Sequence, residues 1–459
     1  MNQRLFFWSL TSALAGFLFG FDVVVISGAE QAIQGLWETT DIEHGIVMSA
    51  ALWGTVIGSL IGFWPTDKFG RTKTLIVIGL LFLVSAVWSS LATDVNSFKL
   101  ARFIGGIGVG VATIAAPLYI SEISPPRNRG LLAGLFQFNI VFGIMVAYGS
   151  NYLISTYFGG ENAWRWMMGV EAVPALLYTL FCLGLPASPR WLIAKRGDRD
   201  GAARVLKMIS PDASQTEITT LADEIAISCK TDQQGTVKDS FWSRRLMKPI
   251  LLAFLLAFFN QLSGINAILF FAKRIFGLAG LGHHDALLSS IGIGVTNLVF
   301  TMVGLWLIDR AGRRTLLYIG TVGYVVSLGL CSYAFFNESF AIVPICVFAF
   351  IAAHAVGQGA VIWVLIAEIF PGQHRASGQT WGCATHWVFA ALITTFFPMV
   401  IGAREDAVTG EVSTAFDPGY IFAFFCGMMV LQGIWIALMV PETKGVSLEE
   451  IEKKLGIDS

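Results

Sequence analysis

One acidic residue lies alone in the middle of the first apolar run of the chain. Asp22 is the only charged residue between positions 5 and 29. An ionised carboxylate inside a membrane costs at least about 2.5–3.5 kcal/mol, so it must be paired, hydrated or protonated part of the time. Arg102, in the fourth apolar run, is its natural partner. Desolvation disfavours the charged carboxylate and a neighbouring guanidinium favours it, so rearranging the pair can bind or release a proton. The pair is a candidate for proton coupling; the alternative is a static ion pair that holds two helices together.

Neutral polar side chains form a second set in otherwise apolar runs. Amides both donate and accept hydrogen bonds, so they suit an uncharged ligand with many hydroxyls, and an indole can pack on the apolar side of a sugar ring. Hydrogen bonding between helices explains any single amide better, but the whole set favours a carbohydrate site. Gly264 would let its helix open and turn two amides toward a cavity. The candidate sugar contacts are Phe19, Gln137, Asn260, Gln261, Asn266, Asn297, Trp363, His386 and Trp387.

Two charged motifs recur in the loops. The pattern Asp-x-x-Gly-Arg follows the second and the eighth apolar runs at an offset of 242 residues, and a Glu and an Arg spaced by seven follow the fourth and the tenth runs at an offset of 246. The recurrence indicates a duplicated six-helix unit with a substrate path between its halves. One copy alone could be only a basic anchor, but a network of ion pairs could tie the bundles together while the cytoplasmic side is closed. The members of this latch are Asp67, Arg71, Glu122, Arg129, Asp309, Arg313, Glu368 and Arg375.

Composition determines the fold class. Of 459 residues, 55% are hydrophobic and only 13% are charged, whereas a water-soluble chain carries about a quarter charged residues. We expect an all-α polytopic membrane protein with twelve transmembrane helices in two pseudo-symmetric six-helix bundles. The apolar runs lie at 6–29, 46–65, 74–92, 98–120, 131–155, 164–186, 249–276, 286–308, 315–336, 341–367, 378–402 and 419–440.

These runs divide the chain into four parts. We expect an N-terminal bundle over 1–186, a cytoplasmic linker over 187–248, a C-terminal bundle over 249–441 and a cytoplasmic tail over 442–459. The linker has apolar residues at helical spacing, which favours short amphipathic helices over a flexible connection. The first run continues past Asp22 without a signal-peptide cleavage site, so it is expected to remain as a membrane span.

Charge predicts the orientation and excludes several function classes. One set of loops, with both ends and the linker, holds 24 of the 30 Lys and Arg residues, which places both termini in the cytoplasm. The formal net charge of −1 gives no reason to expect nucleic acid as a partner. The six cysteines form no CxxC pair, the six histidines form no metal-ligand spacing, and no catalytic nucleophile or phosphate-binding motif is present. We therefore expect no metal, no cofactor and no enzymatic activity.

Ten short motifs, in order along nearly the whole chain, resemble those of the sugar porter family of the major facilitator superfamily. The resemblance implies two six-helix bundles that rock about a central monosaccharide, and Gln137, Gln261, Asn266, Asn297 and Trp363 match the family's sugar-contacting positions. The motifs are Gly20-Phe21-Asp22 with Ile26-Ser27-Gly28-Ala29, Asp67 to Arg71, Arg102 with Gly105-Gly106, Ser121-Glu122 with Arg129-Gly130, Trp164-Arg165-Trp166, Pro186 to Arg190, Gln261 with Gly264-Ile265-Asn266, Asp309 to Arg314, Glu368 with Arg375, and Pro441 to Gly445.

Several positions depart from the family pattern. Asn260 replaces the first glutamine of a pair, His386 stands where bacterial members have Gln and animal facilitators have Asn, and Ala187 replaces the glutamate of the Pro-Glu-Ser-Pro-Arg motif. Ile144 is similar to the hexose facilitators rather than to the bacterial xylose symporter, which favours a hexose. Asp22 is Asp in proton-coupled members and Asn in animal facilitators.

The sequence therefore predicts a proton-coupled importer of a monosaccharide, a hexose ahead of a pentose, that works by alternating access. Its partners would be the sugar, protons and the lipid bilayer, and we expect a monomer in a bacterial inner membrane. The alternatives are a sugar uniporter, in which Asp22 is only structural, and a sugar-sensing receptor, which the short tail after Glu442 disfavours.

Overall fold

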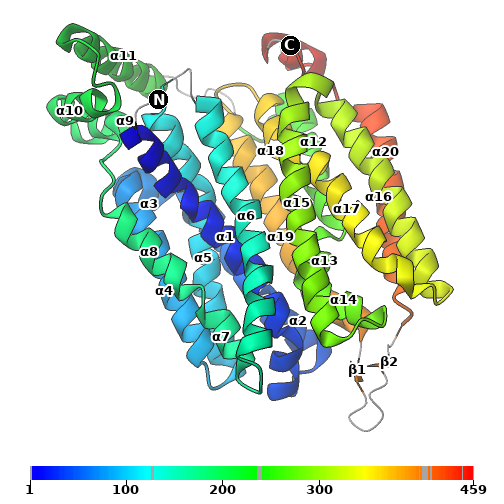
Figure 1. Ribbon diagram of the computed structural model, residues 1–459. Helices are drawn as coiled ribbons and strands as arrows, with labels where there is room; N and C mark the ends of the chain where they lie inside the picture. The colour runs from blue at the N-terminus through cyan, green and yellow to red at the C-terminus, as the bar shows by residue number, and fades with distance from the viewer. Residues whose placement is uncertain are drawn as a thin grey trace.

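The computed structural model describes residues 3–125, 129–234, 240–402, 404–405, 412–413, 416–446 and 448–457. Its long helices form two bundles that stand side by side (Figure 1). The first contains α1 (Gln3–Leu36), α2 (Asp41–Ile61), α3 (Phe63–Lys68), α4 (Arg71–Leu91), α5 (Val95–Ile123), α6 (Arg129–Tyr157), α7 (Ala163–Gly169) and α8 (Ala172–Cys182). The second contains α12 (Met247–Leu262), α13 (Ile265–Phe270), α14 (Ala272–Leu278), α15 (His283–Ala311), α16 (Arg313–Phe336), η4 (Phe340–Ile342), α17 (Val343–Val356), α18 (Gln358–Glu368), α19 (Arg375–Ile401) and α20 (Gly419–Met439).

The sixth predicted run is not one continuous helix. In the described part, eleven helical segments are long and apolar enough to cross a membrane, because this run is divided between α7 and α8. Pro174 has no backbone N–H and cannot bond to the carbonyl of Val170, so the Val173 N–H bonds to that carbonyl at 3.2 Å instead. The break places Glu171 at the joint between the two helices. Together α7 and α8 form the sixth crossing along the chain, in addition to the eleven long segments.

The seventh run opens at the glycine that the sequence singled out. Gly264 has a φ of +87°, in the left-handed region, and separates α12 from α13. A residue with a side chain is strained in this conformation, whereas glycine adopts it freely. The predicted local opening of this helix is therefore confirmed.

Two loop glycines show the internal duplication in the backbone. Gly70 precedes α4 with φ 92° and ψ 156°, and Gly312 precedes α16 with φ 94° and ψ 159°. The two residues occupy the same place in the repeated Asp-x-x-Gly-Arg motif. Equal backbone angles at equal motif positions support a duplicated six-helix unit.

Both ends of the chain lie on one side of the bundles, here called the terminal side; the opposite side is called the far side (Figure 1). The terminal side also carries α9 (Pro189–Trp191), the π-helical turn η2 (Leu192–Arg196), α10 (Arg199–Ile209) and α11 (Gln215–Gln234), with η3 (Arg244–Leu246) before α12 and α21 (Leu448–Leu455) in the tail. The described part of the linker is thus mostly helical. The all-α expectation misses one small feature, a pair of two-residue strands on the far side, β1 (Arg404–Glu405) and β2 (Val412–Ser413).

The two bundles are in tight contact on the far side. Helix α2 packs on α19 so closely that a Cβ at Gly45 would lie 1.8 Å from the carbonyl oxygen of Thr395. The hydroxyls of Ser49 and Thr395 are 2.7 Å apart, and the Tyr148 hydroxyl donates to the Leu269 carbonyl at 2.7 Å. These contacts join one bundle to the other, so the far side is closed in this conformation.

Candidate functional site

The opened seventh crossing supplies three of the predicted sugar contacts. Gln261 is the centre of the group: its Nε2 donates to Asn260 Oδ1 at 3.0 Å, and its Oε1 accepts from Asn266 Nδ2 at 2.7 Å. Asn266 lies beyond the break at Gly264, so the opened backbone lets residues of α12 and α13 meet. All three amides are buried. Their mutual hydrogen bonds keep the donors and acceptors in place without a ligand.

His386 extends this group to α19. Its imidazole nitrogen Nε2 lies 3.1 Å from Gln261 Nε2, and its ring is 5.2 Å from the ring of Trp363 and 4.9 Å from that of Trp387, centroid to centroid. Phe19, from α1 of the other bundle, lies 5.6 Å from the Trp387 ring. The Trp387 Nε1 is buried and has no hydrogen-bond partner among the described residues. Amides, an imidazole and aromatic faces therefore meet at the boundary between the bundles.

Two predicted contacts stand apart from this group. Asn297 on α15 is buried, and its side-chain oxygen accepts a hydrogen bond from Thr301 Oγ1 at 3.4 Å. Gln137 on α6 is half-buried. Within the described ranges, neither side chain makes a hydrogen bond to the group around Gln261.

Asp22 and Arg102 form a buried ion pair between α1 and α5. The Arg102 Nη1 donates to Asp22 Oδ1 at 2.5 Å, and Nη2 donates to Asp22 Oδ2 at 3.3 Å and to the Asp22 backbone carbonyl at 2.8 Å. Their side chains are 0% and 1% exposed. The guanidinium thus holds both the carboxylate and the backbone of α1. The contact between these two residues, which the sequence predicted, is present in the structure.

A second carboxyl group lies beside this pair and was missed in the sequence. Glu171, at the joint between α7 and α8, is buried and interacts electrostatically with Asp22 and Arg102. Apart from Asp22, with which it can share a proton, no described residue donates a hydrogen bond to either of its carboxylate oxygens. The signal that selected Asp22, an acid inside an apolar run, applies equally to Glu171 and could have found it.

The latch residues of the first bundle interact within that bundle. Arg71 binds both oxygens of Glu122, with Nε–Oε2 and Nη2–Oε1 distances of 2.9 and 2.7 Å. Its Nη1 lies 3.5 Å from Asp67. The side chain of Arg129 lies outside the described part of the structure.

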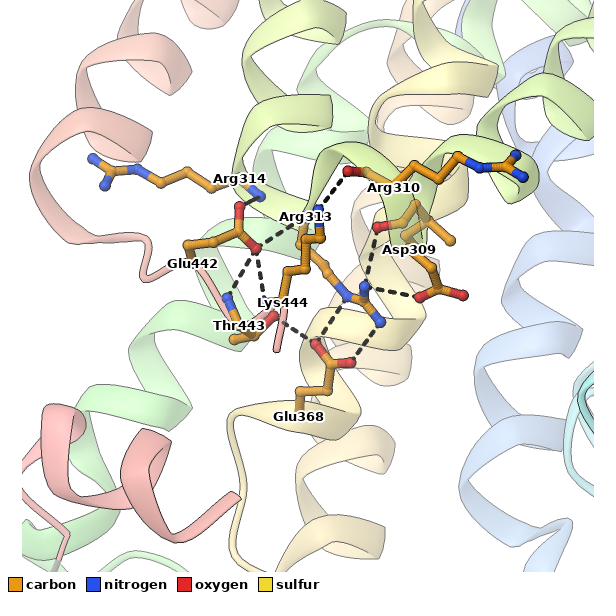
Figure 2. A network of polar contacts seen from close by, with 9 residues as sticks. Asp309, Arg310, Arg313, Arg314, Glu368, Glu442, Thr443 and Lys444 are labelled. Atoms are coloured by element: carbon orange, nitrogen blue, oxygen red, sulfur yellow. Dashed lines mark hydrogen bonds and ion pairs between the residues drawn. The ribbon is translucent and has the colours of Figure 1, made fainter. Parts of the chain in front are cut away.

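The second bundle repeats this arrangement with one addition (Figure 2). Arg313 donates to both oxygens of Glu368 at 3.2 and 2.9 Å and to Asp309 at 3.0 Å. Glu442, from the tail, accepts from the backbone N–H groups of Arg313 and Arg314 at 3.0 Å each. Arg375 makes no ion pair with any described residue. The described latch pairs join helices within a bundle and not one bundle to the other, as fits a conformation that is closed on the far side.

The backbone around Glu442 changes its acidity. Partial burial alone would raise the pKa of this carboxyl group, but hydrogen bonds from the backbone N–H groups of Lys444, Arg313, Arg314 and Thr443 outweigh burial and hold the pKa below its usual value. Glu442 is therefore an anion at neutral pH that caps the first turn of α16.

Known proteins resemble this chain over nearly its whole length. A family model described as "Sugar (and other) transporter" matches residues 8–455. The arabinose-proton symporter of Bacillus subtilis is 34% identical over 453 residues, which cover 97% of this chain and 94% of the relative. The galactose-proton symporter of Escherichia coli (strain K12) is 34% identical over 462 residues, covering 98% and 94%. An inward open structure of the xylose transporter XylE from E. coli superposes with a TM-score of 0.82 at 29% identity, covering 98% of this chain and 99% of that one.

Proposed function

Because this chain belongs to the sugar transporter family, whose members are transporters and not enzymes, we propose that it imports a monosaccharide together with protons by alternating access. The observation that carries the proton coupling is the buried group of Asp22, Arg102 and Glu171. The names of two relatives, an arabinose-proton and a galactose-proton symporter, support the same conclusion.

Two carboxyl groups share one guanidinium in this group. Arg102 can neutralise one carboxylate, and a second ionised acid at membrane depth would remain uncompensated. A proton held by Asp22 or Glu171 removes the excess negative charge. Protonation of Asp22 would loosen its pair with Arg102, free α1 from α5 and favour the outward-open state. Loss of that proton toward the cytoplasm would favour sugar release and reset the cycle.

Helix α1 connects this group to the sugar. Phe19 and Asp22 are three residues apart, about one helical turn, so their side chains leave neighbouring parts of α1. Phe19 contacts Trp387 of the second bundle, whereas Asp22 contacts Arg102 of the first. A movement of α1 that breaks one contact therefore disturbs the other.

The amides around Gln261, together with Gln137, Asn297, Trp363, His386 and Trp387, form the proposed sugar site. Neutral hydrogen-bonding groups beside aromatic rings suit an uncharged, hydroxyl-rich ring. We assign a hexose, because Ile144 places an apolar side chain where the xylose symporter has a polar one. The bundles of residues 1–186 and 249–441 would move about this site, joined by the linker 187–248 and followed by the tail 442–459.

The distribution of Lys and Arg supports cytoplasmic placement of the terminal side, and hence of both termini, in a bacterial inner membrane. On opening toward the outside, the terminal ends of the bundles would approach each other. The latch residues would then exchange some contacts within a bundle for contacts between the bundles.

The test is uptake of labelled glucose into proteoliposomes, with and without an imposed inward proton gradient. Uphill accumulation by the wild type, lost in Asp22→Asn while sugar exchange survives, would establish symport with coupling at Asp22. Asp285→Asn removes an exposed acid on the far side and should behave as wild type. Uptake that only equilibrates would make the protein a uniporter. If glucose, galactose, fructose, xylose and inositol are bound but none of them is transported, the result would favour a receptor.

A further inference from the structure

A second buried charged group lies on the far side, between the bundles. Glu30 is near the end of α1, and its carboxylate accepts hydrogen bonds from Arg274 of α14, with an Nε–Oε2 distance of 3.3 Å and a shorter contact from Nη2 to Oε1. The two side chains are 1% and 3% exposed. Arg274 also donates to Gln34, one turn further along α1.

His44 holds the same carboxylate from α2. Its Nε2 lies 2.6 Å from Glu30 Oε1, and both side chains are buried. The first bundle thus supplies an acid and the histidine that orients it, and the second bundle supplies the guanidinium. The remaining nitrogens, Arg274 Nη1 and His44 Nδ1, are buried without a hydrogen-bond partner among the described residues. The side-chain hydrogen bonds of Arg274 therefore go to Glu30 and Gln34, and that of His44 goes to Glu30.

The other described hydrogen bonds between the bundles on this side do not join two opposite charges. Ser49 meets Thr395, Tyr148 donates to a backbone carbonyl, and the hydroxyls of Tyr152 and Ser155 on α6 contact the rings of His284 and His283 on α15. Of the ion pairs within the described ranges, the pair of Glu30 and Arg274 is the one that joins the two bundles. Opening of the far side must separate these two charges, whereas the latch pairs can persist because each lies inside one bundle.

We propose that Glu30 and Arg274 form an ion-pair lock that keeps the far side closed, and that His44 is the positioning residue that aims Glu30 at Arg274. The inference rests on the proposed alternating-access transport and adds to it the residues that set the balance between the two end states. A bidentate, water-excluded pair is stronger than an exposed one. Removing either charge should therefore shift the population toward the outward-open state.

A cysteine at Ser49 can report this opening. Ser49 is fully buried in the closed far side, so Ser49→Cys should react with a membrane-impermeant maleimide only when that side opens. The protein would be labelled in intact cells, with the same chain lacking the new cysteine as background. We expect Glu30→Gln and Arg274→Gln each to raise the labelling rate about tenfold. The double variant should be no faster than the single ones, because both remove the same interaction.

Three further variants make the test specific. The exchange Glu30→Arg with Arg274→Glu should restore slow labelling if the attraction itself is what matters. His44→Leu should label fast and His44→Gln slowly, because only the amide can still donate to Glu30. Glu161→Gln removes an exposed acid from the loop after α6 and should leave the rate unchanged.

The proposal is overturned if Glu30→Gln and Arg274→Gln, present in the membrane at the wild-type level and monodisperse in detergent, label at the wild-type rate. If the single variants fail to reach the membrane, the variant that combines Glu30→Arg with Arg274→Glu decides: slow labelling supports the lock, and fast labelling overturns it. Labelling needs neither sugar nor a proton gradient, so it tests the lock even if the proposed sugar import fails. Conversely, if the wild type shows proton-driven uptake but Glu30→Gln and Arg274→Gln label at the wild-type rate, the lock is overturned and the proposed import is not.

Discussion

Gln261 and His386 lie 125 residues apart in the chain, yet the amide nitrogen of one is 3.1 Å from a ring nitrogen of the other. The contact joins α12 to α19 at the point where Trp363 and Trp387 flank the imidazole. It therefore places a titratable, flat, hydrogen-bonding ring between two aromatic faces in the proposed sugar site.

This relationship predicts how substitutions of His386 affect sugar binding. His386→Ala removes the contact with Gln261 and the ring between the two tryptophans, at a cost of about 1–3 kcal/mol, which is about 5- to 150-fold in affinity. His386→Gln restores an amide and should lose much less. The measurement is sugar-dependent quenching of tryptophan fluorescence, which Trp363 and Trp387 should dominate. The matched control is His374→Gln, which changes a buried histidine at the terminal side. If His386→Ala and His374→Gln weaken sugar binding equally, His386 is not part of the sugar site.

A second prediction concerns the break in the seventh crossing. Gly264→Ala puts a side chain on a residue with a φ of +87°, and its Cβ would lie 2.5 Å from the Phe425 ring. We expect a loss of about 1–3 kcal/mol of stability, because strain and overpacking add, and weaker sugar binding, because Gln261 and Asn266 flank the break. Thermal unfolding in detergent and the fluorescence titration measure the two effects. Gly277→Ala meets nothing within 4 Å and should be neutral; a neutral Gly264→Ala would contradict the role of the opening.

A third prediction uses the acidity of Glu442. The pKa of Glu442 lies below its ordinary value of 4.5 in the folded chain, so its charge contributes stability that is fully present above the ordinary value and is lost as the pH falls through the folded value. The melting temperatures of wild type and Glu442→Gln should therefore differ by a constant amount from about pH 7.5 to about pH 5 and converge below that. Glu224→Gln, on the exposed face of α11, should show no such gap. A gap that stays constant at acid pH would mean that the charge is not involved.

The sequence predicts most of the fold because long apolar runs and loop charges are local signals. It also predicts the contact of Asp22 with Arg102, since an isolated charge in an apolar run requires a partner. The sequence does not predict that Glu30 is buried, because the first apolar run ends at residue 29 and an acid directly after it resembles an interfacial charge. Arg274 lies near the end of the apolar run 249–276, and the sequence pattern gives it no partner. Only the packing of α1 against α14 shows that the two are buried together, and such long-range packing has no local signature.

The linker permits a final prediction, because Ala187 stands in the first half where Glu442 stands in the second. Each follows a proline, Pro186 or Pro441. The Pro186 carbonyl already accepts hydrogen bonds from the hydroxyls of Thr72 and Tyr119 at 3.0 and 2.9 Å, so this segment lies over the start of α4.

Gly70, which precedes α4, has no side chain that could cap the helix, and its backbone angles are nearly those of Gly312 before α16. A carboxylate at position 187 could therefore accept from the backbone N–H groups at the start of α4 as Glu442 does from those of α16. We expect Ala187→Glu to stabilise the protein by about 1 kcal/mol, seen as a higher melting temperature in detergent. Ala187→Gln should give a smaller gain, because its amide oxygen accepts but carries no charge for the helix dipole. A melting temperature unchanged or lowered in Ala187→Glu would show that the two halves of the terminal side do not share this cap.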